Sequence, residues 1–124
     1  RKVAAAAASQ MKPTVIEAGG SDPMIISAHA PLDVAAAGAV TVAFHLSGQV
    51  CTSTERIYGV DAVHDAFVDA FASQPRALRI GNGLKRSEIG PLASKMARDK
   101  VERLVADAVA KGASAACRKS RLVP

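Results

Sequence analysis

Apolar residues recur along the chain with two different periods, one typical of helices and one typical of short strands. Alanine-rich runs and recurrence at three to four residues predict helices over 3–11, 31–44, 61–78 and 94–112. Short apolar or β-branched runs predict strands over 14–17, 24–27, 56–60 and 113–117. Because strands and helices follow one another in this order, we predict the α/β fold class with a parallel sheet.

The predicted helices carry start and stop signals. Ser94 is expected to cap the last helix and Gly112 to end it, whereas Asp61 is expected to cap the helix over 61–78 and Pro75 to end or kink it. The residues expected to face the core are Val34, Ala37, Thr41 and Phe44 in the second helix, Val63, Phe67, Ala70 and Phe71 in the third, and Val101, Leu104, Val105, Ala108 and Val109 in the last.

The composition limits the kind of core the chain can form. It has 124 residues, of which 49% are hydrophobic and only 3% are aromatic. This length suits one domain, and the lack of aromatics predicts a core of Ala, Val, Ile and Leu. No apolar run approaches the roughly 18 residues of a membrane-spanning helix, and the stretch Val3–Ala8 is too short for the core of a signal peptide. We therefore predict that the protein has no membrane partner.

The positive charge does not indicate nucleic-acid binding. The formal net charge is +5, but the only dense basic run is Arg118-Lys119-Ser120-Arg121, and no aromatic residues are interleaved with it. Nucleic-acid-binding domains usually gather basic residues on one face. We therefore interpret the charge as a solvated surface with a basic tail and predict no nucleic-acid partner.

The cysteines and histidines do not form a metal-binding pattern. Cys51 and Cys117 form no CxxC pair, which argues against a zinc site or a disulfide framework and favours a reduced, cytoplasmic setting. No two of His29, His45 and His64 have the i, i+4 spacing of helical metal ligands, so no metal is predicted. Cys117 is expected to be a core residue. His45, close to the turn before Cys51, could touch a ligand or lie at the surface.

Cys51 has the clearest potential for chemistry. Gly48 allows a sharp turn before it, and Thr52, Ser53 and Thr54 follow it with amides and hydroxyls. Backbone N–H groups around a thiol favour the thiolate, the better nucleophile, and also stabilise the oxyanion that forms when sulfur adds to a carbonyl. A lone cysteine in apolar surroundings is more often a core residue, so the local sequence alone leaves both interpretations open.

Glu17 is the second candidate. It ends the predicted strand 14–17 and is followed directly by Ala18-Gly19-Gly20. Ligands of open α/β sheets bind at the carboxyl ends of the strands, and a carboxylate there can act as a general base on a thiol or on water. The alternative is a strand-end carboxylate that is simply solvated.

Three segments resemble those of aldehyde dehydrogenases. VIEAGGSDP at 15–23 resembles their glutamate motif, and the separation of Glu17 from Cys51 (51 − 17 = 34) is that of the family. EIGPLASKMARDKVERLVADAVAKGA at 88–113 resembles the segment that follows, and the similarity fades at Arg118. FHLSGQVCTSTERIYG at 44–59 resembles the cysteine motif, including Phe44, Gly48, Gln49 and Cys51.

The resemblance implies oxidation of a small-molecule aldehyde to an acid with NAD or NADP. Cys51 would add to the aldehyde to give a thiohemiacetal, and loss of hydride to the cofactor would leave a thioester. Glu17 would activate the water that hydrolyses this thioester. The backbone N–H of Cys51 would form part of the oxyanion hole, and Gly19 and Gly20 would line the channel near the nicotinamide.

The resemblance also implies a truncated aldehyde-dehydrogenase-like fold. Residues 1–20 would be a remnant of the cofactor-binding domain, 21–117 a partial catalytic domain, and 118–124 a basic tail. No phosphate-binding glycine loop occurs in the sequence, so the chain alone is expected to bind the dinucleotide poorly. It is also expected to expose apolar faces, which a homo-oligomer would cover.

Two further functions stay open. A pair of Cys51 and Glu17 needs no cofactor to cleave an activated ester, so the chain could be a thiol esterase or hydrolase. It could also be a non-catalytic, oligomeric interaction module, in which case Cys51 would be dispensable.

Overall fold

The computed structural model describes residues 1–117, so the basic tail 118–124 lies outside the described residues. The strands are β1 (Asp22–Ile26) and β2 (Thr54–Gly59). The α-helices are α1 (Lys2–Ala8), α2 (Leu32–Phe44), α3 (His64–Ser73) and α4 (Lys95–Ala110). Short 3-10 helices cover His45–Gly48, Asp61–Val63, Gln74–Ala77 and Gly83–Lys85.

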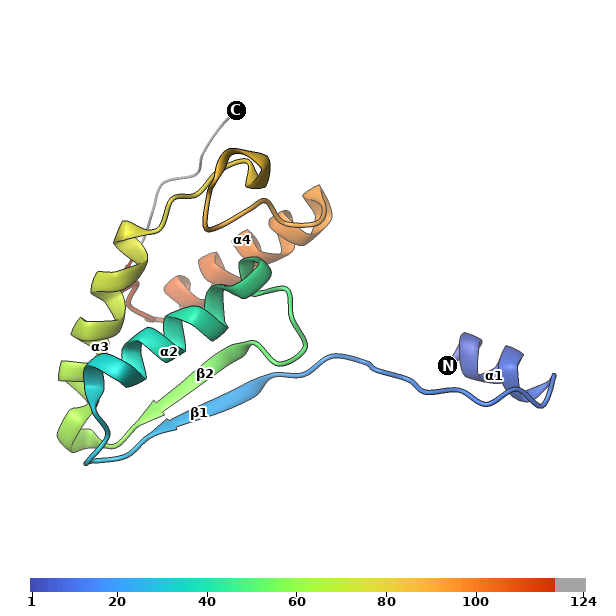
Figure 1. Cartoon of the computed structure of the whole chain (residues 1–124), viewed down its shortest axis with the longest axis horizontal. Coiled ribbons are helices and arrows are strands. Elements are labelled where there is room, and N and C mark those ends of the chain that lie inside the picture. The colour runs from blue at the N-terminus through green and yellow to red at the C-terminus, as the bar shows by residue number, and fades with distance from the viewer. Residues whose placement is uncertain (118–124) are drawn as a thin grey trace.

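β1 and β2 form a parallel pair in which Ile25 lies opposite Tyr58. α2 connects the two strands, as a parallel pair requires, because a tight hairpin cannot join them. Figure 1 shows this β1–α2–β2 unit at the centre of the molecule, with α3 beside α2. The predicted α/β class and parallel pairing are therefore confirmed, and the strands predicted over 24–27 and 56–60 are found within two residues of those bounds.

The core lies between the sheet and the two central helices. Ile26 of β1 packs with Ala36 and Ala39 of α2 and with Phe67 of α3, and none of the four is more than 5% exposed. Half-buried apolar side chains surround this cluster, among them Phe71, whose ring stacks on that of Phe67 with centroids 6.0 Å apart. The expected small-residue core is confirmed, with one aromatic pair at its edge.

α2 buries a different face from the one predicted. The residues predicted to face the core, Val34, Ala37, Thr41 and Phe44, are exposed or half-buried. The buried residues are instead Ala36, Ala39 and Val40. α2 is apolar nearly all round, so its pattern does not select one face. The alanine face packs inward because small side chains let the helix approach the sheet closely.

Two predicted strands do not form. Residues 14–17 and 113–117 have no strand structure, so both predictions are wrong. An apolar, β-branched run becomes a strand only where it can pair and pack. Within residues 1–117, the sheet consists of β1 and β2, and neither segment is paired with it.

α3 starts later than predicted. Asp61 begins a short 3-10 turn, α3 starts at His64, and its N-cap residue Val63 makes no side-chain cap, so the predicted Asp61 cap is wrong. The effect of Pro75 is confirmed, because α3 ends at Ser73 and Pro75 lies in a 3-10 turn.

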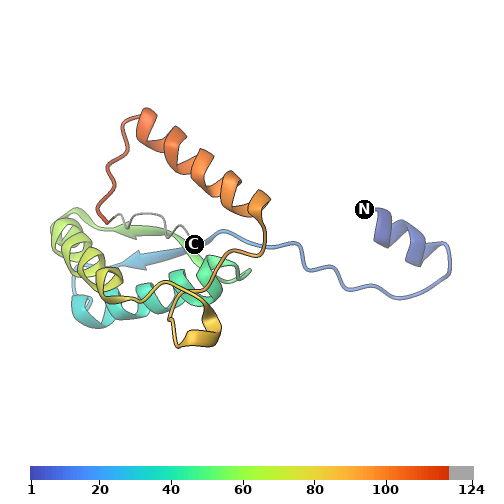
Figure 2. The ribbon, with the colours of Figure 1, turned by 90° about the horizontal axis from the view of Figure 1, so that it is seen from above.

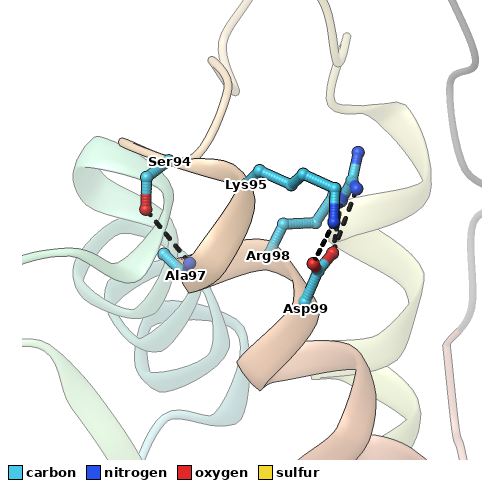
Figure 3. Close-up of polar contacts among 5 residues, drawn as sticks. All are labelled: Ser94, Lys95, Ala97, Arg98 and Asp99. Carbon is cyan, nitrogen blue, oxygen red and sulfur yellow. Dashed lines mark hydrogen bonds and ion pairs between the residues drawn. The ribbon is translucent and has the colours of Figure 1, made fainter.

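α4 begins and ends as predicted. The backbone N–H of Ala97 donates to Oγ of Ser94 over 3.1 Å, which caps the helix (Figure 3). Asp99 accepts from Lys95 at 2.5 Å and from Arg98 at 3.0 Å. The hydrogen bond from Lys95, followed by that from Arg98, lowers the pKa of the Asp99 carboxyl group.

The two ends of the described chain lie outside the core. α1 lies at the far end of an extended arm (Figure 1), and α4 stands apart from the sheet (Figure 2). Neither helix contains a buried residue, so the prediction of a buried face on α4 is wrong. The chain exposes 9755 Å², against roughly 6200 Å² for a compact protein of this mass. The expectation of exposed apolar faces is therefore confirmed.

Candidate active site

Cys51 follows a turn with an unusual backbone. Leu46, Ser47 and Gly48 have φ values of 47°, 62° and 74°. Glycine adopts this left-handed region freely, which confirms the sharp turn predicted at Gly48. A residue with a Cβ costs about 1–3 kcal/mol there. Leu46 and Ser47 therefore need contacts that hold the turn in place.

Hydrogen bonds from two side chains hold this turn against residues 90–93. Oγ of Ser47 donates to the carbonyl oxygen of Gly90 over 2.9 Å. Oε1 of Gln49 accepts from the backbone N–H of Ala93 over 2.8 Å, and its Nε2 donates to the carbonyl oxygen of Leu46 over 2.8 Å. Each such bond contributes roughly 1 kcal/mol, which is the same order as the backbone cost.

Cys51 itself lies in a second tight turn, with its thiol exposed. The backbone N–H of Ser53 donates to the carbonyl oxygen of Val50 over 3.1 Å. Ser53 is 2% exposed, and its Oγ donates to the carbonyl oxygens of Val42 and Ala43, at 3.3 and 3.4 Å, near the end of α2. The exposure of Cys51 excludes a core role for it.

Gly20 brings the glutamate motif into contact with the cysteine motif. A methyl group added at Gly20 would lie 2.5 Å from the Cys51 carbonyl oxygen, so only glycine allows this approach. The strand register explains the contact, because Asp22 at the start of β1 lies opposite Thr54 at the start of β2. The neighbouring Gly19 has φ 91°, with nothing within 4 Å of the position a Cβ would take.

Glu17 is three residues before this contact and is exposed. It lies on the extended arm and makes no hydrogen bond or ion pair with another residue among 1–117. Its flanking residues are exposed too, Val15 at 90% and Ile16 at 58%. The structure thus brings Gly20 to Cys51, while the pairing of the Glu17 carboxylate with the thiol stays a prediction.

A hollow of about 240 Å³ lies beside the Cys51 turn. It is lined by Thr41, Val42, His45, Val50, Thr52 and Ser53. Both sequence neighbours of Cys51 therefore border it, as does the exposed His45. The hollow could not be predicted from the sequence, because its walls come from two separate segments, the end of α2 and the turn that contains Cys51.

The segment that braces the cysteine turn is itself closed by an ion pair. The guanidinium of Arg79 forms hydrogen bonds with the carboxylate of Glu88, and the backbone N–H of Arg79 donates to the same carboxylate over 2.8 Å. These bonds, with the side-chain bond foremost, lower the pKa of Glu88 to about 2. The two ends of the loop 79–89 are thus bonded to each other, and Gly90 follows directly after them.

Neither a metal site nor a membrane helix is found among residues 1–117. No group of three His, Cys, Asp or Glu residues there could hold a metal ion. None of the described helices is both long and apolar enough to cross a bilayer. Cys117, predicted to be a core residue, is half-buried and lies outside the core cluster.

Comparison with known proteins identifies the family. The sequence pattern of the aldehyde dehydrogenase family matches residues 1–122. The chain belongs to this family. It is 42% identical over 118 residues to succinate-semialdehyde dehydrogenase, NADP(+), of Mycolicibacterium paratuberculosis, which is 94% of this chain and 25% of that protein.

Two solved structures contain the same fold. An oxidoreductase from Marinobacter aquaeolei matches with TM-score 0.89 and 36% identity, over 96% of this chain and 25% of that one. Succinate-semialdehyde dehydrogenase from Burkholderia pseudomallei matches with TM-score 0.86 and 38% identity, over 92% and 24%.

The chain spans about a quarter of the length of these relatives. This confirms the prediction of a partial aldehyde-dehydrogenase fold. Because the first match covers 96% of the chain, it includes most of the arm that carries Glu17. The extended course of most of the arm is therefore found in that solved structure too.

The family implies NAD or NADP as cofactor, and the predicted role of Gly19 and Gly20 in lining its channel stays a prediction. Gly19 leaves open space where a side chain would stand, and the Cys51 thiol is exposed. Both fit the approach of a flat ring. Gly20, by contrast, is needed for the chain's own packing against Cys51.

Proposed function

We propose that the protein oxidises an aldehyde to the corresponding acid with NAD or NADP, using Cys51 as the nucleophile. The observation that carries this proposal is the exposed thiol of Cys51 on a doubly held turn beside a hollow, in a chain of the aldehyde dehydrogenase family. An exposed thiol among free backbone N–H groups is suited to add to a carbonyl carbon.

In the first step the sulfur of Cys51 bonds to the aldehyde carbon. The carbonyl π electrons move to oxygen, which takes up the proton that the thiol gives up, and a thiohemiacetal results. The backbone N–H of Cys51 stabilises the negative charge on that oxygen. When bound, NAD(P)+ would supply the hydride acceptor. Loss of hydride from the adduct's carbon, and of its hydroxyl proton to water, leaves a thioester.

In the second step Glu17 acts as the general base. It takes a proton from water, the water oxygen bonds to the thioester carbon, and the carbon–sulfur bond breaks to release the acid and the Cys51 thiolate. The contact of Gly20 with the Cys51 carbonyl supports this role, since Glu17 is only three residues before Gly20 in the sequence. Gly19, with its open side, is proposed to line the nicotinamide channel with Gly20.

The relatives' names suggest a substrate class. Because a relative at 42% identity is named succinate-semialdehyde dehydrogenase, NADP(+), we propose a short aldehyde with a carboxylate tail as substrate and NADP as cofactor. The hollow lined by His45, Thr41 and Thr52 is proposed to hold the tail, because these three side chains can bond to a carboxylate and both sequence neighbours of Cys51 border it.

Surroundings and assembly follow from the same features. We propose a cytoplasmic setting, because a nucleophilic thiol must stay reduced. We propose a homo-oligomer, because the exposed residues of α4 and of the sheet, such as Leu104, Ile25 and Tyr58, present apolar surface. We also propose that residues 1–20 belong to the cofactor-binding domain and 21–117 to the catalytic domain of the family's fold.

The test is oxidation of succinate semialdehyde by the full chain. Reduced cofactor is followed by its absorbance with NADP and, separately, with NAD. We expect turnover that is lost in Cys51→Ala and kept in Cys117→Ala. Equal rates in the wild type and in Cys51→Ala would refute the proposal.

A cofactor-independent esterase is the second candidate, and the exposure of Cys51 favours it. p-Nitrophenyl acetate tests it, because acetyl transfer to the thiol requires no hydride acceptor. Cleavage by the wild type but not by Cys51→Ala, together with no aldehyde oxidation, would favour the esterase. The non-catalytic interaction module would be favoured if the wild type neither oxidises the aldehyde nor cleaves the ester, and if its oligomer persists in Cys51→Ala.

A further inference from the structure

Gln49 uses both ends of its side-chain amide on two different parts of the chain. Its Nε2 donates to the carbonyl oxygen of Leu46, inside the cysteine turn, and its Oε1 accepts from the backbone N–H of Ala93, 44 residues away. A side chain that donates to one segment and accepts from another fixes the distance between them. Gln49 is also only two residues before Cys51.

The turn that Gln49 bonds to is strained and weakly closed at its end. The backbone hydrogen bond that follows it, from the N–H of Gln49 to the carbonyl oxygen of Leu46, is 3.3 Å long, beyond the usual range. Leu46 and Ser47 are both in the left-handed region. Such conformations persist only where the surroundings over-determine them, and they occur at functional sites. Here the surroundings are the side-chain bonds of Gln49 and Ser47.

The segment at the other end of these bonds is a firm anchor. Before Gly90, the loop is closed by the bonds between Arg79 and Glu88 and by the backbone bond from the N–H of Gly81 to the carbonyl oxygen of Ile89, 2.9 Å long. Gly90 and Ala93, which bond to the cysteine turn, therefore follow directly after a loop that is closed by its own hydrogen bonds.

We propose that Gln49 is a positioning residue, which keeps Cys51 reactive by bridging the strained turn to the closed loop. The proposal rests on Cys51 being the nucleophile. Gln49 does not touch the reacting atoms. It acts by holding the turn that leads into Cys51, and without the bridge Leu46 and Ser47 relax to ordinary conformations that move the thiol.

The test is the rate at which iodoacetamide alkylates each cysteine in the full chain. Mass spectrometry of the two cysteine peptides separates Cys51 from Cys117. Gln49→Met keeps the length of the side chain but removes both hydrogen bonds. We expect it to slow Cys51 roughly tenfold, as a small misplacement does, while Cys117 is unchanged. Gln10→Met, at an exposed glutamine on the arm, is the matched control and should change neither rate.

A partial rescue separates positioning from general damage to the fold. Gln49→Glu keeps an oxygen that can accept from Ala93 but loses the donor to Leu46, so it should recover part, and not all, of the Cys51 rate at high salt, where its added charge is screened. Ser47→Ala supplies an independent second variant. The double variant should slow the alkylation of Cys51 by less than the product of the two single effects, because both bonds hold one turn.

The outcomes distinguish this proposal from the proposed function. If wild-type Cys51 reacts no faster than Cys117, the nucleophile itself is in error and both proposals fail. If wild-type Cys51 is fast and neither Gln49→Met nor Ser47→Ala slows it by more than about twofold, only the positioning role is overturned. Equal slowing of Cys51 and Cys117, without rescue by Gln49→Glu, also overturns it.

Discussion

Cys51 lies on a turn that other segments hold from three sides, whereas Glu17 lies on an exposed arm without a bond to any other residue among 1–117. On the cysteine side, Ser53 ties the turn to α2, Gln49 ties it to the 90–93 segment, and Gly20 packs against its carbonyl. The nucleophile of the proposed reaction is therefore positioned by the chain's own contacts. The proposed base is positioned only through its short connection to Gly20.

This difference indicates which part of the site needs packing partners in addition to the residues described here, 1–117. Val15 and Ile16, which precede Glu17, have strand-forming side chains and yet are exposed. Such a run gains stability only when another strand or helix covers it. We infer that the cysteine side needs little beyond residues 20–93, while the glutamate side needs an additional surface against the arm.

Glu17→Gln tests the weakly held side and has the largest expected effect. Hydrolysis of the acetyl group left on Cys51 by p-nitrophenyl acetate should slow about 100-fold, the low end for a general base, because the arm is loosely held. The thermal midpoint should not change, since the side chain is exposed. Mass spectrometry measures the lifetime of acetyl-Cys51.

Asp69→Asn is the matched control for this substitution. It neutralises an exposed carboxylate on α3, far along the chain from the arm, and should leave hydrolysis unchanged. If Glu17→Gln behaves like Asp69→Asn, Glu17 is not the base, and the comparison between the two sides would concern structure alone.

Gly20→Ala tests the contact that joins the two sides. The added methyl group would lie 2.5 Å from the Cys51 carbonyl oxygen, so one of the two segments must move. We expect a loss of about 1–3 kcal/mol in the free energy of unfolding, measured by urea denaturation, together with slower alkylation of Cys51. Gly83→Ala, where nothing lies within 4 Å of the new methyl group, should have little effect, and equal losses in both variants would contradict the contact.

The elements that were predicted correctly from the sequence are those whose own residues decide them. Ser94 caps α4, and Gly112 lies just after the end of α4. Pro75 lies just after the end of α3. The elements that were predicted wrongly depend on partners. Residues 14–17 have strand-forming side chains but pair with no strand, whereas 113–117 contain no β-branched or aromatic residue and so favour a strand only weakly. α2 is apolar on several faces, so the face that it buries depends on how it packs against the sheet.

The candidate site shows the same division. The turn at Gly48 and the exposed thiol of Cys51 follow from local residues, and the motif resemblance adds Glu17. The hydrogen bonds that hold the cysteine turn could not be predicted, because Ser47 and Gln49 bond to partners 43 and 44 residues away. A hydrogen bond over such a separation leaves no local pattern, and neither does the contact of Gly20 with a backbone carbonyl.

Leu104→Lys on α4 tests whether the exposed apolar face serves assembly. A charged side chain in the middle of this face should weaken self-association, seen as a lower mass in sedimentation at the same concentration, while the stability of the chain changes by less than about 0.5 kcal/mol. Ala106→Lys places the same charge on the opposite side of the helix and should leave the mass unchanged. Self-association that survives Leu104→Lys would place the interface elsewhere.

Glu88→Gln tests the anchor behind the cysteine turn and has the smallest expected effect, because the ion pair with Arg79 is exposed. The pKa of Glu88 is lowered from 4.5 to about 2. A lowered pKa means that the ionised, paired form stabilises the fold above pH 4.5, and that this contribution is lost as the pH falls from there through about 2. Calorimetry should therefore show a steeper fall in the thermal midpoint of the wild type than of Glu88→Gln across this interval, with the two curves parallel above it. Asp69→Asn should follow the wild type, and a Glu88→Gln curve parallel to the wild type throughout would show that the pair contributes nothing to the anchor.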